Sequence, residues 1–365
     1  MIKNASMDGA SSCTANNRTD ETQKGSLLLS GLSFSELENQ LVQYMHSSTK
    51  VLASLQRFVR NNLEVKRSAN YKCKKTDNPN ILLDVLDLHR DHEEIVVHCL
   101  KTLRILARKQ QNRENISTRL IQTLSRILQE NKDQNMELAS EGSNVLLNLC
   151  FEARNVSSLT STNCVPALMD LLSQQENKEV LVAALGALHS ISFQEVGKKM
   201  LIECNAIEKL CPLLKENNKK VKKKAIGTIH NLSSELSVVH MINNLQQIPS
   251  IIDLLEDTNP SIASSAAGCL QNLSRDDRAR DVIQQLEGPA RLTNLIFSTD
   301  NTMGQVSSIG ALVNILGPDA QHDETKKKAL KKILGMCLLV GQLKGLSVDL
   351  ENMADFSITS QDDIS

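Results

Sequence analysis

The sequence predicts an all-α fold built from repeated helical units, for three reasons. Short segments of similar pattern recur along the chain at nearly constant spacing. Within each segment, apolar residues stand three or four positions apart, which is the spacing of one face of an α-helix. Aromatic residues make up only 2% of the chain and Trp is absent, whereas sheet proteins favour aromatic and β-branched residues.

Six recurring segments carry the repeat. Each places one position, usually Asn, among fixed apolar neighbours, as in the Ala-Ile-Gly-Thr-Ile-His-Asn-Leu of residues 225–232. The equivalent positions are 105, 148, 190, 231, 272 and 314, so the period is 41 to 43 residues. A period of this length is typical of helical repeats that stack into a solenoid.

Two further helical stretches precede this one in each unit. One is longer and apolar, as at 121–128, 165–172, 207–214 and 248–255, and the other is short, as at 111–116 and 277–283. We expect a left-handed backbone at Asn163, Asn205 and Gly288, because Asn and Gly tolerate that conformation best. Pro212 lies inside its apolar stretch, where it predicts a kink or a later helix start. Asn259 followed by Pro260 predicts a helix start.

The two ends of the array are less regular. The stretch 51–59 is predicted as the last helix of a degenerate first unit, followed by an insertion at 61–78 that is rich in Lys and Asn. The stretch 326–346 is predicted as a terminal helix pair with a polar outer face. We expect disordered tails at 1–33 and at 347–365, the latter acidic. The predicted solenoid therefore spans 34–346, and its repeats are clearest over 80–316.

The sequence pattern of the repeats resembles that of the armadillo family. Gly-Ala-Leu-x-Asn-Leu-Ser in the last helix and Ile-Pro-x-Leu-x-x-Leu-Leu in the middle one are similar to the armadillo consensus. The resemblance implies a right-handed superhelical solenoid of about six clear units with degenerate ends. It also implies a concave groove, lined by the third helix of each unit, that binds proteins. Import adaptors of the importin-α type carry Trp four residues before the Asn position, whereas the residues there are more like β-catenin-type repeats: Gly186, Gly227, Gly268 and Gly310.

The resemblance places a ladder of polar residues in that groove, namely Asn148, Ser190, Asn231, Asn272 and Asn314. An Asn amide both donates and accepts hydrogen bonds, so it can bind the peptide groups of an extended partner. It can equally bond to a neighbouring backbone and only hold the helices. The sequence leaves both roles open.

A run of lysines begins the third helix of the fourth clear unit. The consecutive residues 222–224 cover almost a full turn, so at least one of them points toward the groove. Lys223 and Lys224, with His230 and Arg275 nearby, are candidates for binding an acidic segment. A solvated helix start is the alternative.

No catalytic activity is predicted. The sequence contains no glycine-rich phosphate loop, no G-x-S-x-G and no H-E-x-x-H. The nine cysteines form no C-x-x-C pair, so we expect neither a metal site nor a cofactor. His89 and His92, the densest His cluster, are expected in a solvated turn. A net charge of −1 and few aromatic residues argue against nucleic-acid binding.

The sequence therefore predicts a non-catalytic scaffold or adaptor that binds an extended or acidic protein segment, with no small-molecule substrate. Two alternatives are a regulator of a small GTPase or a nuclear-transport adaptor, and a structural component of a ciliary or cytoskeletal assembly. Apolar runs are far shorter than the roughly 20 residues of a membrane span, and the first residues lack a signal pattern. We expect a cytoplasmic or nuclear protein that is not inserted in a membrane.

Overall fold

The computed structural model describes residues 32–63, 79–131, 134–174 and 176–320, with isolated positions up to 335. These residues fall into two compact units, Met1–Asn112 and Arg113–Ser365. Regular structure in the described residues is helical throughout. Nearly all of the predicted tails, of the insertion and of the terminal helix pair lies outside them. Among the described residues, no helix is long and apolar enough to cross a membrane.

The first unit contains two pairs of helices, the first of which is the degenerate end. The helix predicted at 51–59 lies within α3, and α3 packs against α6. Phe34 and Phe58 hold the first pair together, with ring centroids 6.2 Å apart in an edge-to-face arrangement. The helices are α2 (Phe34–Tyr44), α3 (Ser48–Asn62), α5 (Ile81–Leu88) and α6 (Glu93–Leu106), and α7 (Gln110–Glu114) crosses the boundary between the units.

The predicted solvated turn at the histidine pair is wrong for His89, which is buried. Its Nε2 lies 2.7 Å from the carbonyl oxygen of Met45, and its Nδ1 lies 3.3 Å from Oγ of Ser48. The same hydroxyl is 3.3 Å from Nε2 of His92. The two imidazoles therefore tie this turn to the start of α3, more than forty residues upstream, which the local sequence could not reveal. No group of His, Cys, Asp and Glu in the described residues could hold a metal ion.

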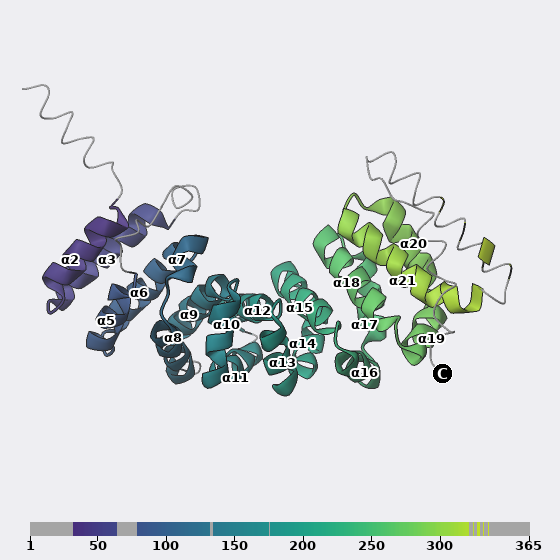
Figure 1. The fold of residues 1–365 in the computed structure, drawn as a ribbon, viewed down its shortest axis with the longest axis horizontal. Helices are drawn as coiled ribbons and strands as arrows, with labels where there is room; N and C mark the ends of the chain where they lie inside the picture. The colour runs from purple at the N-terminus through teal and green to yellow at the C-terminus, as the bar shows by residue number, and fades with distance from the viewer. Residues whose placement is uncertain are drawn as a thin grey trace, which may run out of the picture. The chain divides into compact units, whose positions relative to one another are not determined.

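The second unit repeats a three-helix arrangement, as Figure 1 shows for the helices from α8 onward. The helices are α8 (Thr118–Asn131) and α9 (Met136–Leu149); α10 (Ala153–Ser158), α11 (Cys164–Asp170) and α12 (Lys178–Ile191); α13 (Glu195–Glu203), α14 (Ala206–Leu210) and α15 (Lys219–Leu232); α16 (Leu236–Asn244), α17 (Ile248–Asp253) and α18 (Pro260–Leu273); and α19 (Asp277–Gln285), α20 (Gly288–Ser298) and α21 (Thr302–Ala320).

Asparagine caps set the start of the third helices. In α15, Oδ1 of Asn218 accepts hydrogen bonds from the backbone nitrogens of Lys220 and Val221. In α18, Asn259 caps in the same way and Pro260 is the first helical residue, as the sequence predicted. A side-chain cap satisfies N–H groups that have no partner within the helix. Asn135 and Asn177 cap α9 and α12.

One middle helix changes where the sequence placed an internal proline, but the left-handed residues were predicted only in part. After α14 the chain continues at Cys211 as a 3₁₀ turn with Pro212 near its start, so the helix changes type at the residue where a kink or a later start was expected. Asn205 is left-handed with φ 54°, whereas Asn163 has φ −89°. In the last unit the left-handed residue is Glu287, at φ 56°, and Gly288 begins the helix instead.

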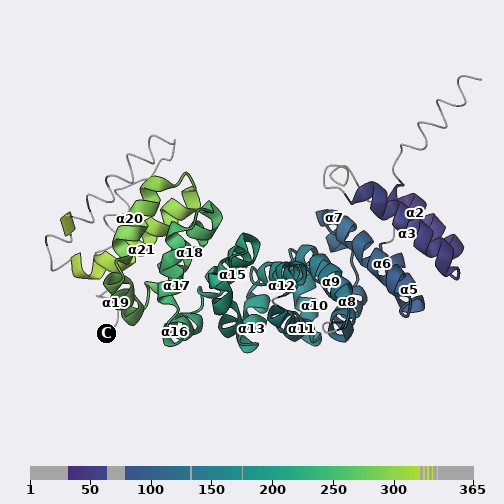
Figure 2. The ribbon, with the colours of Figure 1, turned by 180° about the vertical axis from the view of Figure 1, so that it is seen from behind.

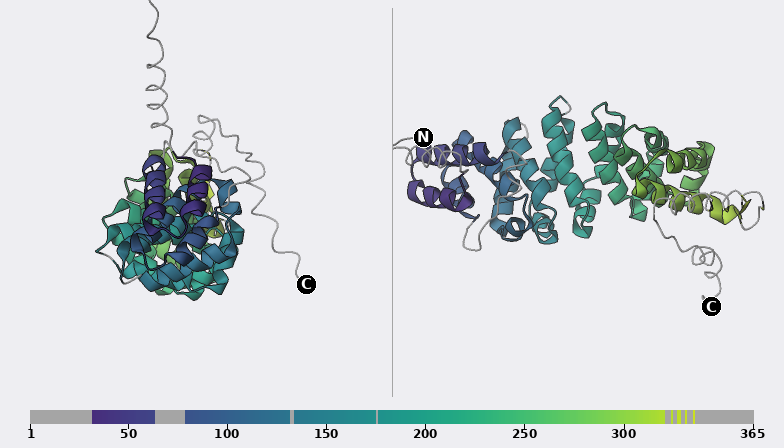
Figure 3. Two further views of the ribbon diagram at one scale, coloured as in Figure 1. Left: turned by 90° about the vertical axis from the view of Figure 1, so that its left-hand side faces the viewer. Right: turned by 90° about the horizontal axis from the view of Figure 1, so that it is seen from above.

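Successive third helices of the second unit pack against one another. Contacts run from α9 to α12, then to α15, α18 and α21, and Figures 2 and 3 show these helices following one another along the unit. Their inner faces supply fully buried side chains such as Leu185, Ile226 and Leu270. One unit cannot bury this apolar face alone, so stacking produces a continuous core. Because the same contact recurs, equivalent exposed positions line up from one repeat to the next.

Candidate functional site

Each third helix of the second unit carries one narrow stripe of mostly partly exposed residues, although Gly186, Ser190, Gly227 and Gly268 within it are buried. On α15 the stripe consists of Lys223, Gly227, His230 and Asn231, spaced so that all lie on one side of the helix. We call the surface formed by the equivalent stripes the third-helix face. Its members are Ser140, Asn144, Leu147 and Asn148 of α9; Val182, Gly186, His189 and Ser190 of α12; the four residues of α15; Ser264, Gly268, Gln271 and Asn272 of α18; and Val306, Gly310, Val313 and Asn314 of α21.

Three asparagines of the predicted ladder bind the preceding repeat. Nδ2 of Asn231 donates to Oγ of Ser192 at 2.8 Å, and Nδ2 of Asn272 donates to Oγ of Ser233 at 3.0 Å. Each accepting serine is the residue that ends the third helix of the previous repeat. Asn314 repeats the contact with Ser274 at 3.0 Å. The amide nitrogens therefore join neighbouring repeats, which is the structural role that the sequence left open.

The amide oxygens of the same three residues remain available. No described residue donates a hydrogen bond to Oδ1 of Asn231, Asn272 or Asn314. These side chains are only partly buried, and the bonds of their amide nitrogens to the preceding repeat fix the orientation of the oxygens. The two roles considered from the sequence are thus compatible, because one end of the amide holds the helices while the other can accept a hydrogen bond.

The two remaining ladder positions are Asn148 and Ser190. Nδ2 of Asn148 lies 3.4 Å from the carbonyl oxygen of Asn144 within its own helix. Ser190 is 1% exposed, so it is not presented at the surface as the sequence suggested. The asparagine–serine bond between repeats recurs on α15, α18 and α21.

A second regular contact involves the glycines of the stripe. The residue before each ladder position lies over the glycine of the next repeat: His189 over Gly227, and His230 over Gly268. A Cβ atom added at Gly227 would stand 2.8 Å from Cε1 of His189. Glycine is required because this ring occupies the space of a side chain. His230, predicted as a binding residue, therefore packs between repeats.

The environment of His189 keeps its imidazole neutral. Burial, followed by the charges of Lys224 and Lys223 and by His230, lowers the pKa of His189 to about 4. Its Nδ1 is buried without a hydrogen-bond partner in the described residues. Its ring stands edge-on to that of Phe193, with centroids 4.9 Å apart. Burial likewise lowers the pKa of His230. Both rings therefore behave as packing groups at neutral pH.

The lysines at the start of α15 divide into two groups. Lys222 forms an ion pair with Asp257 at 3.0 Å, and Lys219 donates to the hydroxyl of Thr258 at 3.1 Å. Lys223 is exposed and Lys224 is half-buried, and neither has a carboxylate within ion-pair distance among the described residues. Burial and the neighbouring Lys223 lower the pKa of Lys224. The predicted basic site thus consists of two ammonium groups without a carboxylate partner in the described residues, Lys223 on the third-helix face and Lys224 beside it.

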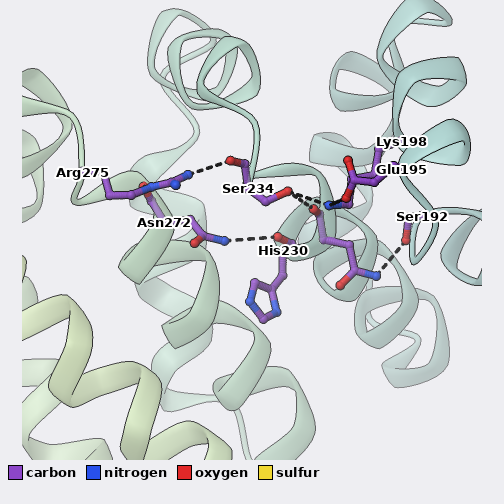
Figure 4. A network of polar contacts seen from close by, with 8 residues as sticks. Ser192, Glu195, Lys198, His230, Ser234, Asn272 and Arg275 are labelled. Atoms are coloured by element: carbon purple, nitrogen blue, oxygen red, sulfur yellow. Dashed lines mark hydrogen bonds and ion pairs between the residues drawn. The ribbon is translucent and has the colours of Figure 1, made fainter.

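Arg275 is bound to the preceding repeat. Its Nη2 donates to the carbonyl oxygens of Ser233 and Ser234, at 3.2 and 2.8 Å, and its Nε donates to the carbonyl of Asn272. These carbonyls follow the end of α15, where a cation also interacts favourably with the helix dipole. Figure 4 shows Arg275 beside Asn272 in this network. The guanidinium predicted for the groove therefore holds two repeats together.

The sequence reasoning missed the serines that receive the asparagine bonds. Ser192, Ser233 and Ser274 recur two positions after the ladder residue, and the last two stand in the Asn-Leu-Ser motif that suggested the family. The recurring serine was visible in the sequence, but the bond joins the Asn of one repeat to the Ser of the repeat before it. Only the packing of successive third helices shows this pairing.

Comparisons with known proteins agree with this architecture. The armadillo/beta-catenin-like repeat family matches residues 153–193 and 195–234, which are the repeats ending in α12 and α15. An engineered protein aligns over 93% of both chains with a TM-score of 0.62 and 18% identity. A designed armadillo repeat protein aligns over 66% of this chain and all of its own, with a TM-score of 0.59 and 18% identity.

A further solved structure contains a ligand. It is a designed armadillo repeat protein in complex with the peptide (KR)4, and it aligns over 66% of this chain and all of its own, with a TM-score of 0.56 and 19% identity. No curated protein matched the chain in sequence. Two repeats of the chain thus match the armadillo family, and its described residues have the helical repeat fold of designed armadillo proteins.

Proposed function

We propose that the chain is a non-catalytic scaffold or adaptor that holds an extended segment of another protein along the third-helix face. The observation that carries the proposal is the row of amide oxygens on Asn231, Asn272 and Asn314. Each is fixed by a bond from its own amide nitrogen to the preceding repeat and has no donor among the described residues. An extended backbone offers N–H groups that can donate hydrogen bonds to such oxygens.

The spacing of the row suits an extended chain. Packed helices lie about 8–10 Å apart, and an extended peptide advances about 3.3 Å per residue. One asparagine would therefore contact the partner at about every third residue of the partner segment. Because the contact is to the backbone, it contributes affinity without requiring a particular side chain. Side chains elsewhere on the face would supply the specificity.

The comparison structures favour peptide binding as the general mode but not the same ligand. The designed neighbour holds a peptide of alternating Lys and Arg. In this chain Lys223 is exposed on the third-helix face, and Lys224 beside it is half-buried. Neither has an acidic partner in the described residues. A basic segment would be repelled there. The proposed partner is therefore an extended segment that is not basic, in the cytoplasm or the nucleus.

The test uses two substitutions that break the same hydrogen bond. Twelve-residue peptides are selected from a random display library on the intact protein, and their affinities are measured for Asn272→Ala and Ser233→Ala. Both variants lose the Asn272–Ser233 bond, but only Asn272→Ala also removes Oδ1. Ser233 is fully buried, so a partner cannot touch it. We expect affinity to fall about tenfold in Asn272→Ala, as for one lost hydrogen bond of about 1.4 kcal/mol, and to change little in Ser233→Ala.

Equal affinities in the two variants would show that Asn272 acts only between repeats and would contradict the proposal for that residue. Circular dichroism on both variants shows whether each is folded. The equivalent pair Asn231→Ala and Ser192→Ala repeats the comparison one unit earlier. Failure of the library to yield any binding peptide would contradict the proposed function as a whole.

A further inference from the structure

The third-helix face changes in chemical character along the second unit. Eight residues before the ladder position stands Lys223 on α15, Ser264 on α18 and Val306 on α21. One turn earlier on the same side, the residues are Lys220, Ser261 and Met303. Equivalent places on three successive helices are thus cationic, then small and polar, then apolar.

The positive charges on α15 lie at the N-terminal end of the helix, where the helix dipole disfavours them. The N-terminal end of a helix carries partial positive charge and favours acidic residues, yet the first turn of α15 contains no acidic residue. Lys222 is neutralised by Asp257 from the following repeat. Lys223 and Lys224 have no such carboxylate in the described residues, and burial together with the charge of Lys223 lowers the pKa of Lys224. An anion bound between them would relieve both their repulsion and that of the helix end.

The apolar end of the face is unusually exposed. Met303 is 66% exposed and Val306 is 53% exposed, and they stand one turn apart on the same side of α21. A single exposed apolar residue is ordinary in a soluble protein. Here two occur together, at the places that lysines occupy on α15. They form an apolar surface on the same side of α21 as Asn314, eleven and eight residues before it.

We infer that the partner segment carries one or two acidic side chains bound at Lys223 and Lys224 and a bulky apolar side chain bound at Met303 and Val306. Two steps of about 8–10 Å separate α15 from α21. An extended chain covers that distance in about five or six residues. The serines of α18 lie between and allow small or polar side chains there. The inference rests on the proposed function and adds the chemistry and spacing of its ligand.

The library selection described above tests the inference directly. Selected peptides are expected to share Asp or Glu at a distance of five or six residues from Leu, Ile, Met or Phe. Binding peptides without this pairing would overturn the inference while leaving the proposed function intact. If acidic residues were enriched without apolar ones, Met303 and Val306 would not bind the partner, and the inference would again fail. A selection that yields no binder fails the proposed function first.

Charge exchange provides the second arm. Lys223→Glu with Lys224→Glu is expected to weaken a selected acidic peptide at least tenfold, and the same peptide with its acidic residues changed to Lys should regain most of that loss. Lys199→Glu, at an exposed position on α13, controls for charge reversal away from the third-helix face and should leave affinity within about twofold. Met303→Ser with Val306→Ser should weaken only peptides that carry the apolar residue. Equal effects from Lys199→Glu, or no recovery on charge exchange, would overturn the assignment of the acidic site.

Discussion

The imidazole of His230 on α15 lies directly against the backbone of Gly268 on α18. A methyl group at position 268 would overlap the ring at Cε1 and Nε2. The same relationship joins His189 to Gly227 one repeat earlier, so the close approach of successive third helices depends on a ring in one repeat and a glycine in the next. The stripe that carries the proposed binding residues is held in shape by these contacts.

Gly268→Ala is therefore expected to destabilise the protein. Alanine favours a helix over glycine by about 0.5–1 kcal/mol, but an overlap that displaces a packed ring costs about 1–3 kcal/mol, so the net effect is a loss. Urea unfolding measures it. Gly317→Ala on α21 is the matched control, because no heavy atom lies within 4 Å of an added Cβ there, and it should gain stability. Adding His230→Ala to Gly268→Ala should recover part of the loss, and a stable single variant would contradict the packing.

The Asn272–Ser233 bond is expected to couple two repeats energetically. A neutral hydrogen bond contributes about 0.5–1.5 kcal/mol, and Asn272→Ala and Ser233→Ala both remove it. The double variant should therefore lose less stability than the sum of the single losses, by about that amount. A double-mutant cycle in urea measures the difference. Strict additivity would mean that the two side chains do not interact.

Stability is expected to fall on acidification between about pH 6.5 and pH 4. Burial and the facing charges of Lys224 and Lys223 lower the pKa of His189 to about 4, whereas the unfolded imidazole titrates near 6.5. Between these values the unfolded chain binds more protons than the folded one, so each unit of falling pH costs up to about 1.4 kcal/mol from this residue. The free energy of unfolding of His189→Gln should depend less steeply on pH. His46→Gln, at an exposed position, should keep the steepness of the wild type.

The cysteines should react in an order set by burial. Burial raises the pKa of the Cys164, Cys211 and Cys269 thiols to about 12, and the thiolate is the reactive form. Cys204 is only partly buried. Among the described cysteines, Cys204 should be alkylated first in the native protein, and the others only after unfolding. Mass spectrometry of timed iodoacetamide reactions reads the order directly, and early labelling of Cys269 would contradict the packing of α18.

The sequence predicted the repeat well because its information is periodic. Fixed apolar spacing and Asn caps such as Asn259 identify helix faces and helix starts without knowledge of tertiary contacts. Contacts between repeats were not predictable in the same way. His230 and Arg275 looked like surface groups, because their partners, Gly268 and the carbonyls that follow α15, lie about one repeat away. His89 was misplaced for the same reason.

The separate roles of the two ends of the asparagine amide, nitrogen and oxygen, are the least predictable feature. Sequence reasoning weighed binding against holding as alternatives, since a single Asn usually satisfies local groups. Packing brings Ser233 to the amide nitrogen of Asn272 and leaves its oxygen without a donor in the described residues. The exposed Met303 also gave no signal, because a lone Met in a helical pattern resembles a core residue.

Photo-cross-linking of a selected peptide tests the central claim most directly. A peptide with a photoreactive residue at its centre is bound to the intact protein and irradiated, and the modified protein residues are identified by mass spectrometry. Cross-links are expected within 182–190, 223–231, 264–272 and 306–314, the stretches that form the third-helix face from α12 to α21. Cross-links confined to α10, α13, α16 and α19 would show that partners bind elsewhere and would contradict the account.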